Sequence, residues 1–114
     1  MHELSVTESI LEISLRHARE ANATRVLGLN LVIGQLASIV DDSVQFYWAI
    51  VSKDTPAEGA ELHFRRIPTE LLCRQCNQRY HPDGDLACPN CGGSQVKILA
   101  GEEFYLEAID VENQ

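Results

Sequence analysis

Two short cysteine motifs dominate this 114-residue sequence: CRQC at residues 73–76 and CPNCGG at residues 88–93. Two residues separate the cysteines within each motif, and eleven residues separate the motifs. A two-residue spacing lets one tight turn present both sulfurs to the same tetrahedral centre. Two such turns complete an all-sulfur shell with bonds of about 2.3 Å and leave no position open for a substrate. The spacing therefore predicts one structural zinc ion, held by Cys73, Cys76, Cys88 and Cys91.

The residues that follow each motif support this interpretation. Gly92 can adopt the positive φ that aims backbone N–H groups at sulfur, and Asn77 is the next-best residue for that conformation. Two alternatives stay open: a pair of disulfides, or a rubredoxin-type centre in which iron takes the same four thiolates. His81 lies between the motifs and is an alternative ligand, a residue that supports a ligand from outside or, more simply, a surface histidine.

The composition restricts the partners that this chain can have. Its formal net charge of −8 repels phosphate backbones and anionic lipid headgroups, which argues against nucleic acid or membrane binding. The longest apolar run, residues 29–40, is interrupted by polar residues and falls short of the roughly 20 residues of a membrane span. No signal peptide is visible, so we expect a cytoplasmic protein. Thiols stay reduced in that compartment, which favours a metal site over disulfides.

Hydrophobic periodicity predicts an α+β fold. Two helices pack on a three-stranded sheet, and a zinc-knuckle insertion lies between the second and third strands. The expected order is a helix over 4–21, a strand over 25–33 closed by Gly34, a helix from Asp42 to about 53, a strand over 62–67, and a last strand over 103–111. The corresponding domains are an α+β domain, 1–69 and 97–114, and a zinc-binding insertion, 70–96.

Several side chains carry more specific expectations. Alternation places Leu27, Leu29, Leu31 and Ile33 on one buried side of the first strand. Asp42 is the expected N-cap of the second helix, with Gln45 three residues later. His17 falls on the apolar face of the first helix and is expected in the core. The aromatic residues at 46–48 have helical spacing and are also expected in the core. The alternation of the last strand slips near Ala108, which suggests a bulge.

The N-terminal residues form a second candidate metal site. A histidine at position 2 brings its imidazole within chelating reach of its own backbone nitrogen and of the terminal amine of Met1. The amide of Glu3 can complete a plane, and such nitrogen-rich planar sets suit Ni(II) or Cu(II). Amide nitrogens lose protons on binding, so affinity should rise with pH. Position alone makes this only a weak indication, because a histidine near the start of a chain is common.

The start of the chain, Met1-His2-Glu3-Leu4-Ser5, resembles the start motif of the HypA/HybF family of hydrogenase nickel-maturation proteins. The likeness continues along the chain through several motifs in the same order: Ile33-Gly34-x-Leu36, Thr55-x-Ala57-Glu58-Gly59-Ala60-x-Leu62, Ile67-Pro68, the two cysteine motifs, and Gly101-x-Glu103-Phe104. Departures are mild: Asp41 stands where proline is common in the family, and Phe104 where leucine is.

The resemblance implies a nickel metallochaperone, in which the α+β domain, 1–69 and 97–114, is the nickel-binding domain. It implies Ni(II) at His2 and Glu3, with the amine of Met1 as a further ligand in some members, and zinc at the two cysteine pairs. The implied partners are the GTPase HypB, the large subunit of [NiFe]-hydrogenase and, for some members, urease maturation proteins; a homodimer is an open alternative. The sequence carries no enzyme signature such as a nucleophile elbow, a phosphate loop or HExxH.

Three other functions remain to be weighed against a nickel chaperone. A zinc ribbon that binds nucleic acid would need a basic face, yet residues 73–97 contain only Arg74, Arg79 and Lys97 against two aspartates. A redox carrier would hold iron in the four-cysteine site. A zinc-stabilised adaptor would have no metal cargo.

Overall fold

The computed structural model describes residues 3–113 of the chain. These residues form two helices and six strands in the order α1 (Glu3–Glu20), β1 (Ala23–Gly34), α2 (Asp41–Val51), β2 (Glu61–Ile67), β3 (Glu70–Cys73), β4 (Arg79–Tyr80), β5 (Val96–Ala100) and β6 (Phe104–Asn113). The strands make two three-stranded sheets, β2-β1-β6 and β4-β3-β5. The predicted α+β class is therefore confirmed, and the cysteine segment adds a small sheet of its own that the sequence pattern did not indicate.

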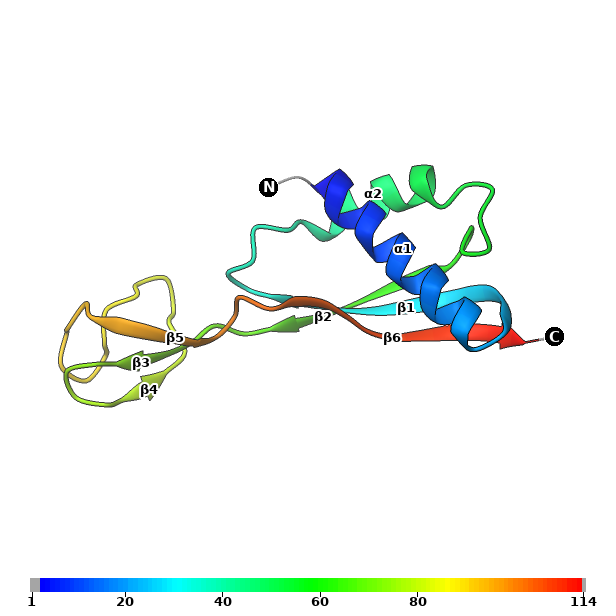
Figure 1. The fold of residues 1–114 in the computed structure, drawn as a ribbon. Coiled ribbons are helices and arrows are strands. Elements are labelled where there is room, and N and C mark those ends of the chain that lie inside the picture. Colours follow the sequence, from blue (N-terminus) through cyan, green and yellow to red (C-terminus); the bar gives the residue numbers. More distant parts are fainter. Residues whose placement is uncertain (1–2, 114) are drawn as a thin grey trace. The chain divides into compact units, whose positions relative to one another are not determined.

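The chain divides into two compact units. The second unit consists of Ile33–Ala37 and Arg66–Phe104, and the first contains the other described residues. In the first unit both helices lie on the same side of the sheet β2-β1-β6 (Figure 1). The second unit contains the predicted insertion, 70–96, and extends beyond it at both ends. Among residues 3–113, no helix is long and apolar enough to cross a membrane.

The core of the first unit forms between the two helices and β1. Ile10 of α1 and Val44 and Trp48 of α2 are almost fully buried, as are Leu29 and Leu31 of β1. Thr7 and Ser14 are buried as well, and each hydroxyl donates to a carbonyl oxygen of its own helix, at 2.6 and 2.8 Å. These internal bonds satisfy the two hydroxyls, so α1 can bury polar residues on its inner face.

β1 is buried on both sides over much of its length, unlike the half-buried strand that the alternation predicts. Val26 and Val32 are fully buried although they lie on the opposite side from Leu29 and Leu31. β1 is the central strand, and the Arg65 guanidinium of β2 bonds to the Glu107 carboxylate of β6 at 2.7 Å across it. Side chains of the two neighbouring strands thus help to bury β1. Leu27, expected inside, is 45% exposed.

Three expectations for the helices are wrong. The N-cap of α2 is Val40 and not Asp42, and no side chain caps it among the described residues; instead the Val40 N–H donates to the carboxylate of Glu3. His17 is exposed rather than packed in the core. Phe46 is 63% exposed, because α2 turns only one side toward the sheet and Trp48 occupies it.

The phase slip that the sequence indicates in the last strand does occur in β6, since Glu107 and Ala108 are exposed in succession.

Residues 33–37 are held against two other segments of the second unit by backbone hydrogen bonds. The N–H groups of Gly34 and Leu36 donate to the carbonyls of Glu103 and Gly101, at 2.6 and 2.7 Å. The N–H of Gln35 donates to the carbonyl of Ile67 at 2.8 Å. The backbones approach so closely that a Cβ on Gly34 would lie 2.1 Å from the Gly101 carbonyl oxygen. Glycine is therefore required at position 34.

Candidate metal centre

The small sheet β4-β3-β5 positions the first cysteine motif. β3 pairs antiparallel with β4, with Leu71 opposite Tyr80, and antiparallel with β5, with Cys73 opposite Val96. Leu71, Cys73, Tyr80 and Cys88 form the buried centre of this unit, with Cys76 and Val96 packed against it. Cys73, Cys76 and Cys88 are thus part of this core, whereas Cys91 is exposed, and little other apolar material surrounds the sulfurs.

The two motifs adopt the same turn. The N–H of Asn77 donates to the carbonyl of Cys73 at 2.8 Å, and the N–H of Gly92 donates to the carbonyl of Cys88 at 2.8 Å. Asn77 and Gly92 both have positive φ, 63° and 74°. These are the residues for which the sequence predicts that conformation, and the structure confirms it. Each turn presents two sulfurs on the same side.

The four thiol sulfurs meet at one point. Cys73, Cys76, Cys88 and Cys91 place their sulfur atoms within 4.8 Å of one another. The Sγ atoms of Cys73 and Cys91 are 3.5 Å apart, and those of Cys76 and Cys88 are 3.6 Å apart. A tetrahedral zinc with bonds of about 2.3 Å requires sulfur separations of about 3.8 Å. All four cysteines are free of disulfides, so the cluster fits zinc and the disulfide alternative fails.

Two polar side chains from the motifs lie against the sulfurs, and the sequence reasoning missed both. The Asn90 amide donates to the Cys76 sulfur at 3.5 Å, and the Gln75 amide oxygen lies 4.0 Å from the Cys91 sulfur. A Cβ on Gly93 would lie 1.7 Å from that Gln75 oxygen, so Gly93 makes room for it. Both residues stand between the two cysteines of a motif, and a polar residue at such a position is the signal that could have identified them.

The thiols differ in acidity because of these contacts. The hydrogen bond from Asn90, followed by the N–H of Gln78, lowers the pKa of Cys76 to about 6. The N–H of Gly93 lowers the pKa of Cys91, but hydrogen bonding among the neighbouring thiols and partial desolvation outweigh it and raise that pKa to about 12. Thiolate is the form that binds metal, so the contacts of Asn90 and Gln78 favour the metal-binding form of Cys76.

His81 is not among the residues that gather at the sulfurs. Its ring is exposed, and its Nδ1 lies 2.8 Å from the carbonyl oxygen of Thr69. A carbonyl can only accept, so Nδ1 must donate, which fixes the tautomer. Within residues 3–113, the four cysteines are the one group of three or more potential ligands close enough to share an ion.

The predicted nickel ligands at Met1 and His2 lie outside the described residues. Glu3 is the first residue of α1, and its carboxylate oxygen lies 3.4 Å from the N–H of Val40, from which it accepts a hydrogen bond. The amides in the first turn of a helix have no acceptor within that helix. Glu3 therefore has a side chain engaged with the fold and an amide at the open end of α1.

Comparison with known proteins gives a consistent result. The family model described as "Hydrogenase/urease nickel incorporation, metallochaperone, hypA" matches residues 1–111. The hydrogenase maturation factor HypA of Dehalococcoides mccartyi is 45% identical over 100% of this chain and 97% of its own length. That of Caldanaerobacter subterraneus is 40% identical over 98% of this chain and 100% of its own length.

Solved structures share the fold. The solution structure of the Ni metallochaperone HypA from Helicobacter pylori matches with a TM-score of 0.69 at 20% identity, and covers all of both chains. A second HypA solution structure matches with a TM-score of 0.76 at 21% identity, covering all of this chain and 98% of the other. With the family model and the sequence relatives, this places the chain in the HypA family of hydrogenase and urease nickel-incorporation metallochaperones.

Proposed function

We propose that this chain binds Ni(II) at its N-terminal residues and delivers it for [NiFe]-hydrogenase maturation. The imidazole and amide of His2 and the amide of Glu3 are the proposed ligands, with the amine of Met1 as the fourth. The observation that carries the proposal is the family match, which begins at residue 1 and includes this motif. Four nitrogen donors in one plane suit Ni(II), which is the cargo here and not a resident cofactor.

The contacts of Glu3 support a role for its amide rather than its carboxylate. The carboxylate accepts from Val40 and so helps to hold the start of α1 near the start of α2. A metal bound at residues 1–3 would then lie next to a fixed helix end. Since amide protons must leave on binding, nickel affinity should increase with pH, and a partner can remove the ion by ligand exchange without catalysis by this chain.

The four-cysteine cluster is proposed as the site of one zinc ion per chain. Cys73, Cys76, Cys88 and Cys91 would hold it, and bound zinc supplies a cross-link among the parts of the second unit. Because four thiolates leave no open position, this ion is structural. Such a site requires reduced thiols, which supports a cytoplasmic location. The proposed partners are the GTPase HypB, the hydrogenase large subunit and urease maturation proteins, with a homodimer as a further assembly to test.

Nickel titration of the zinc-loaded protein tests the proposal. Wild type should bind one Ni(II), and His2→Ala should bind none while it keeps one zinc and an unchanged far-UV spectrum. His17→Ala is the matched control, because it removes an exposed histidine of α1 and should leave nickel binding intact. Equal nickel binding by wild type and His2→Ala would refute the nickel site, and no nickel binding by either protein would favour the zinc-stabilised adaptor. One iron in place of zinc in the purified protein would refute the zinc assignment.

A further inference from the structure

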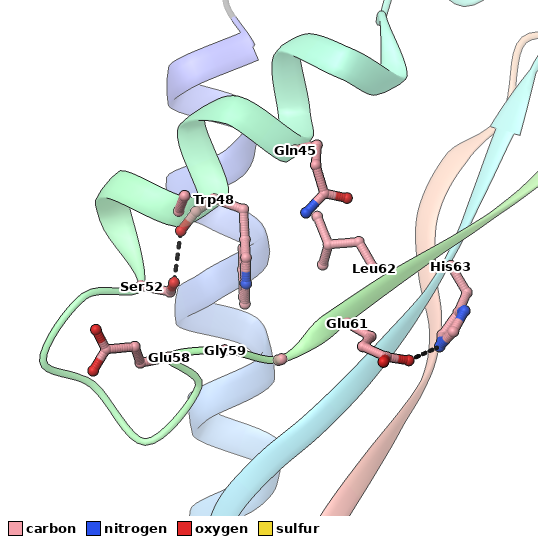
Figure 2. Close-up of a pocket in the computed structure, with 10 residues that line it drawn as sticks. Gln45, Trp48, Ser52, Glu58, Gly59, Glu61, Leu62 and His63 are labelled. Carbon is pink, nitrogen blue, oxygen red and sulfur yellow. Dashed lines mark hydrogen bonds and ion pairs between the residues drawn. The ribbon is translucent and has the colours of Figure 1, made fainter.

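A groove of about 580 Å³ lies between α2 and the start of β2, and none of its lining residues is a proposed metal ligand. Gln45 and Trp48 line it from α2, and Glu58, Glu61, Leu62 and His63 line it from the segment that leads into β2 and from β2 itself. Figure 2 shows the side chains of Gln45, Trp48 and Leu62 between the helix and the strand, with the Glu58 carboxylate on one side of them and Glu61 and His63 on the other. β2 is an edge strand, so no further strand covers its outer side. The volume lies within the range of sites that bind small ligands or short peptide segments.

One polar group at this groove lacks a partner. Trp48 is 2% exposed, and its indole Nε1 has no hydrogen-bond acceptor among the described residues. Buried indole N–H groups normally find an acceptor. Figure 2 shows the indole descending from α2 toward Gly59, alongside Gln45 and Leu62. An acceptor atom that entered the groove beside Trp48 would satisfy this N–H.

The charge of the groove is acidic. Glu58 and Glu61 are the charged residues among its lining, and their carboxylates stand at an exposed rim; the Glu61 side chain is 78% exposed. The Arg25 guanidinium donates to the backbone carbonyl of Glu58 at 3.4 Å. The Nε2 atom of His63 lies 3.5 Å from a carboxylate oxygen of Glu61. The rim therefore favours a cationic group, in line with the net charge of −8.

We propose that this groove binds an extended basic segment of a partner protein. Separate lysine or arginine side chains of the segment pair with Glu58 and with Glu61, and one of its backbone carbonyls accepts from Trp48 Nε1. A peptide supplies both the cation and the acceptor, whereas a simple polyamine such as spermine supplies only the cation. The proposal is independent of nickel binding, because none of the lining residues belongs to the proposed nickel or zinc ligands.

Trp48 is the single tryptophan of the chain, so its indole N–H gives one resonance that reports on the groove. The zinc-loaded, full-length protein is titrated with a fluorescein-labelled hexapeptide of alternating arginine and valine, and with the same peptide carrying glutamate for arginine. Anisotropy should give a Kd about tenfold or more lower for the arginine peptide, and the Kd should rise with added salt. At saturation the indole N–H proton should move downfield, and spermine at the same charge concentration should leave it unmoved.

Matched variants separate the groove from general acidity. The double variant Glu58→Gln, Glu61→Gln should weaken arginine-peptide binding by about tenfold. The double variant Glu8→Gln, Glu12→Gln removes the same charge from exposed positions on α1 and should change the Kd by less than about twofold. Trp48→Phe keeps a ring but removes the N–H, and should weaken binding with zinc content unchanged. Equal affinity for both peptides, an unmoved indole resonance at saturation, or equal weakening by the two double variants would overturn the proposal.

Discussion

The carboxylate of Glu3, the first residue of α1, accepts a hydrogen bond from the backbone N–H of Val40, the residue before α2. This contact links two residues that are 37 positions apart in the sequence. It joins the residue that precedes α2 to a side chain of another helix, and that side chain belongs to a residue whose amide is a proposed nickel ligand. The side chain of Glu3 therefore has a structural partner that is separate from any role of its amide.

Glu3→Ala should separate these two roles. The variant loses the bond to Val40 but keeps the amide, so we expect the free energy of unfolding to fall by about 0.5–1 kcal/mol while the nickel stoichiometry stays at one. Urea unfolding and nickel titration measure the two effects. Glu8→Ala, on the exposed side of the same helix, is the control for helix propensity. Loss of nickel binding in Glu3→Ala alone would show that the carboxylate is a ligand.

Asn90→Ala should change the acidity of Cys76 in the zinc-free protein. The folded pKa of Cys76 is about 6, below its ordinary value, so the thiolate stabilises the zinc-free fold at high pH and this contribution is lost as the pH falls through about 6. The hydrogen bond from the Asn90 amide is the largest cause of this lowered pKa. Without it, the pH at which the step in thiolate absorbance near 240 nm appears should rise by roughly one pH unit. Cys76→Ser should remove the step. A step that stays near pH 6 in Asn90→Ala would exclude Asn90 as its cause.

His81→Ala should leave the zinc site intact. The ring of His81 is held by the Thr69 carbonyl and does not belong to the four-sulfur cluster. We therefore expect one zinc per chain in this variant, with stability reduced by about 1 kcal/mol through the lost hydrogen bond. Metal analysis and thermal unfolding test this. Cys88→Ser is the comparison that should lose zinc, and a zinc loss of similar size in His81→Ala would make the histidine a ligand.

Gly34→Ala should disrupt the second unit. The new Cβ would lie 2.1 Å from the carbonyl oxygen of Gly101, and backbone cannot move aside as a flexible side chain can. We expect a loss of roughly 3 kcal/mol or more and loss of slow hydrogen exchange at the N–H of Leu36. Gly28→Ala is the control, because its Cβ would lie 3.2 Å from a side-chain atom, the Asp110 carboxylate oxygen. Equal stability of the two variants would contradict this account.

Much of the fold follows from short-range patterns. The apolar positions of α1, the strands at both ends of the cysteine segment and the phase slip in β6 are all visible in the sequence. Capping was the exception: Asp42 and Gln45 form a reasonable local signal, but Glu3 reaches Val40 from a different helix. The burial of individual side chains was also not predictable from local patterns. Phe46 is exposed and Val32 is buried because of the elements that lie, or do not lie, next to them.

The sequence by itself determined the four-cysteine site. Each motif needs only a tight turn to present two sulfurs, and Asn77 and Gly92 supply the positive φ that such turns require. Spacing and turn chemistry are local properties, so they can be read from residue order. The tertiary structure alone decided that Asn90 bonds to Cys76, that Gln75 fills the space over Gly93, and that Trp48 borders an acidic groove with an unpaired N–H. Those relationships join separate segments, and packing brings them together.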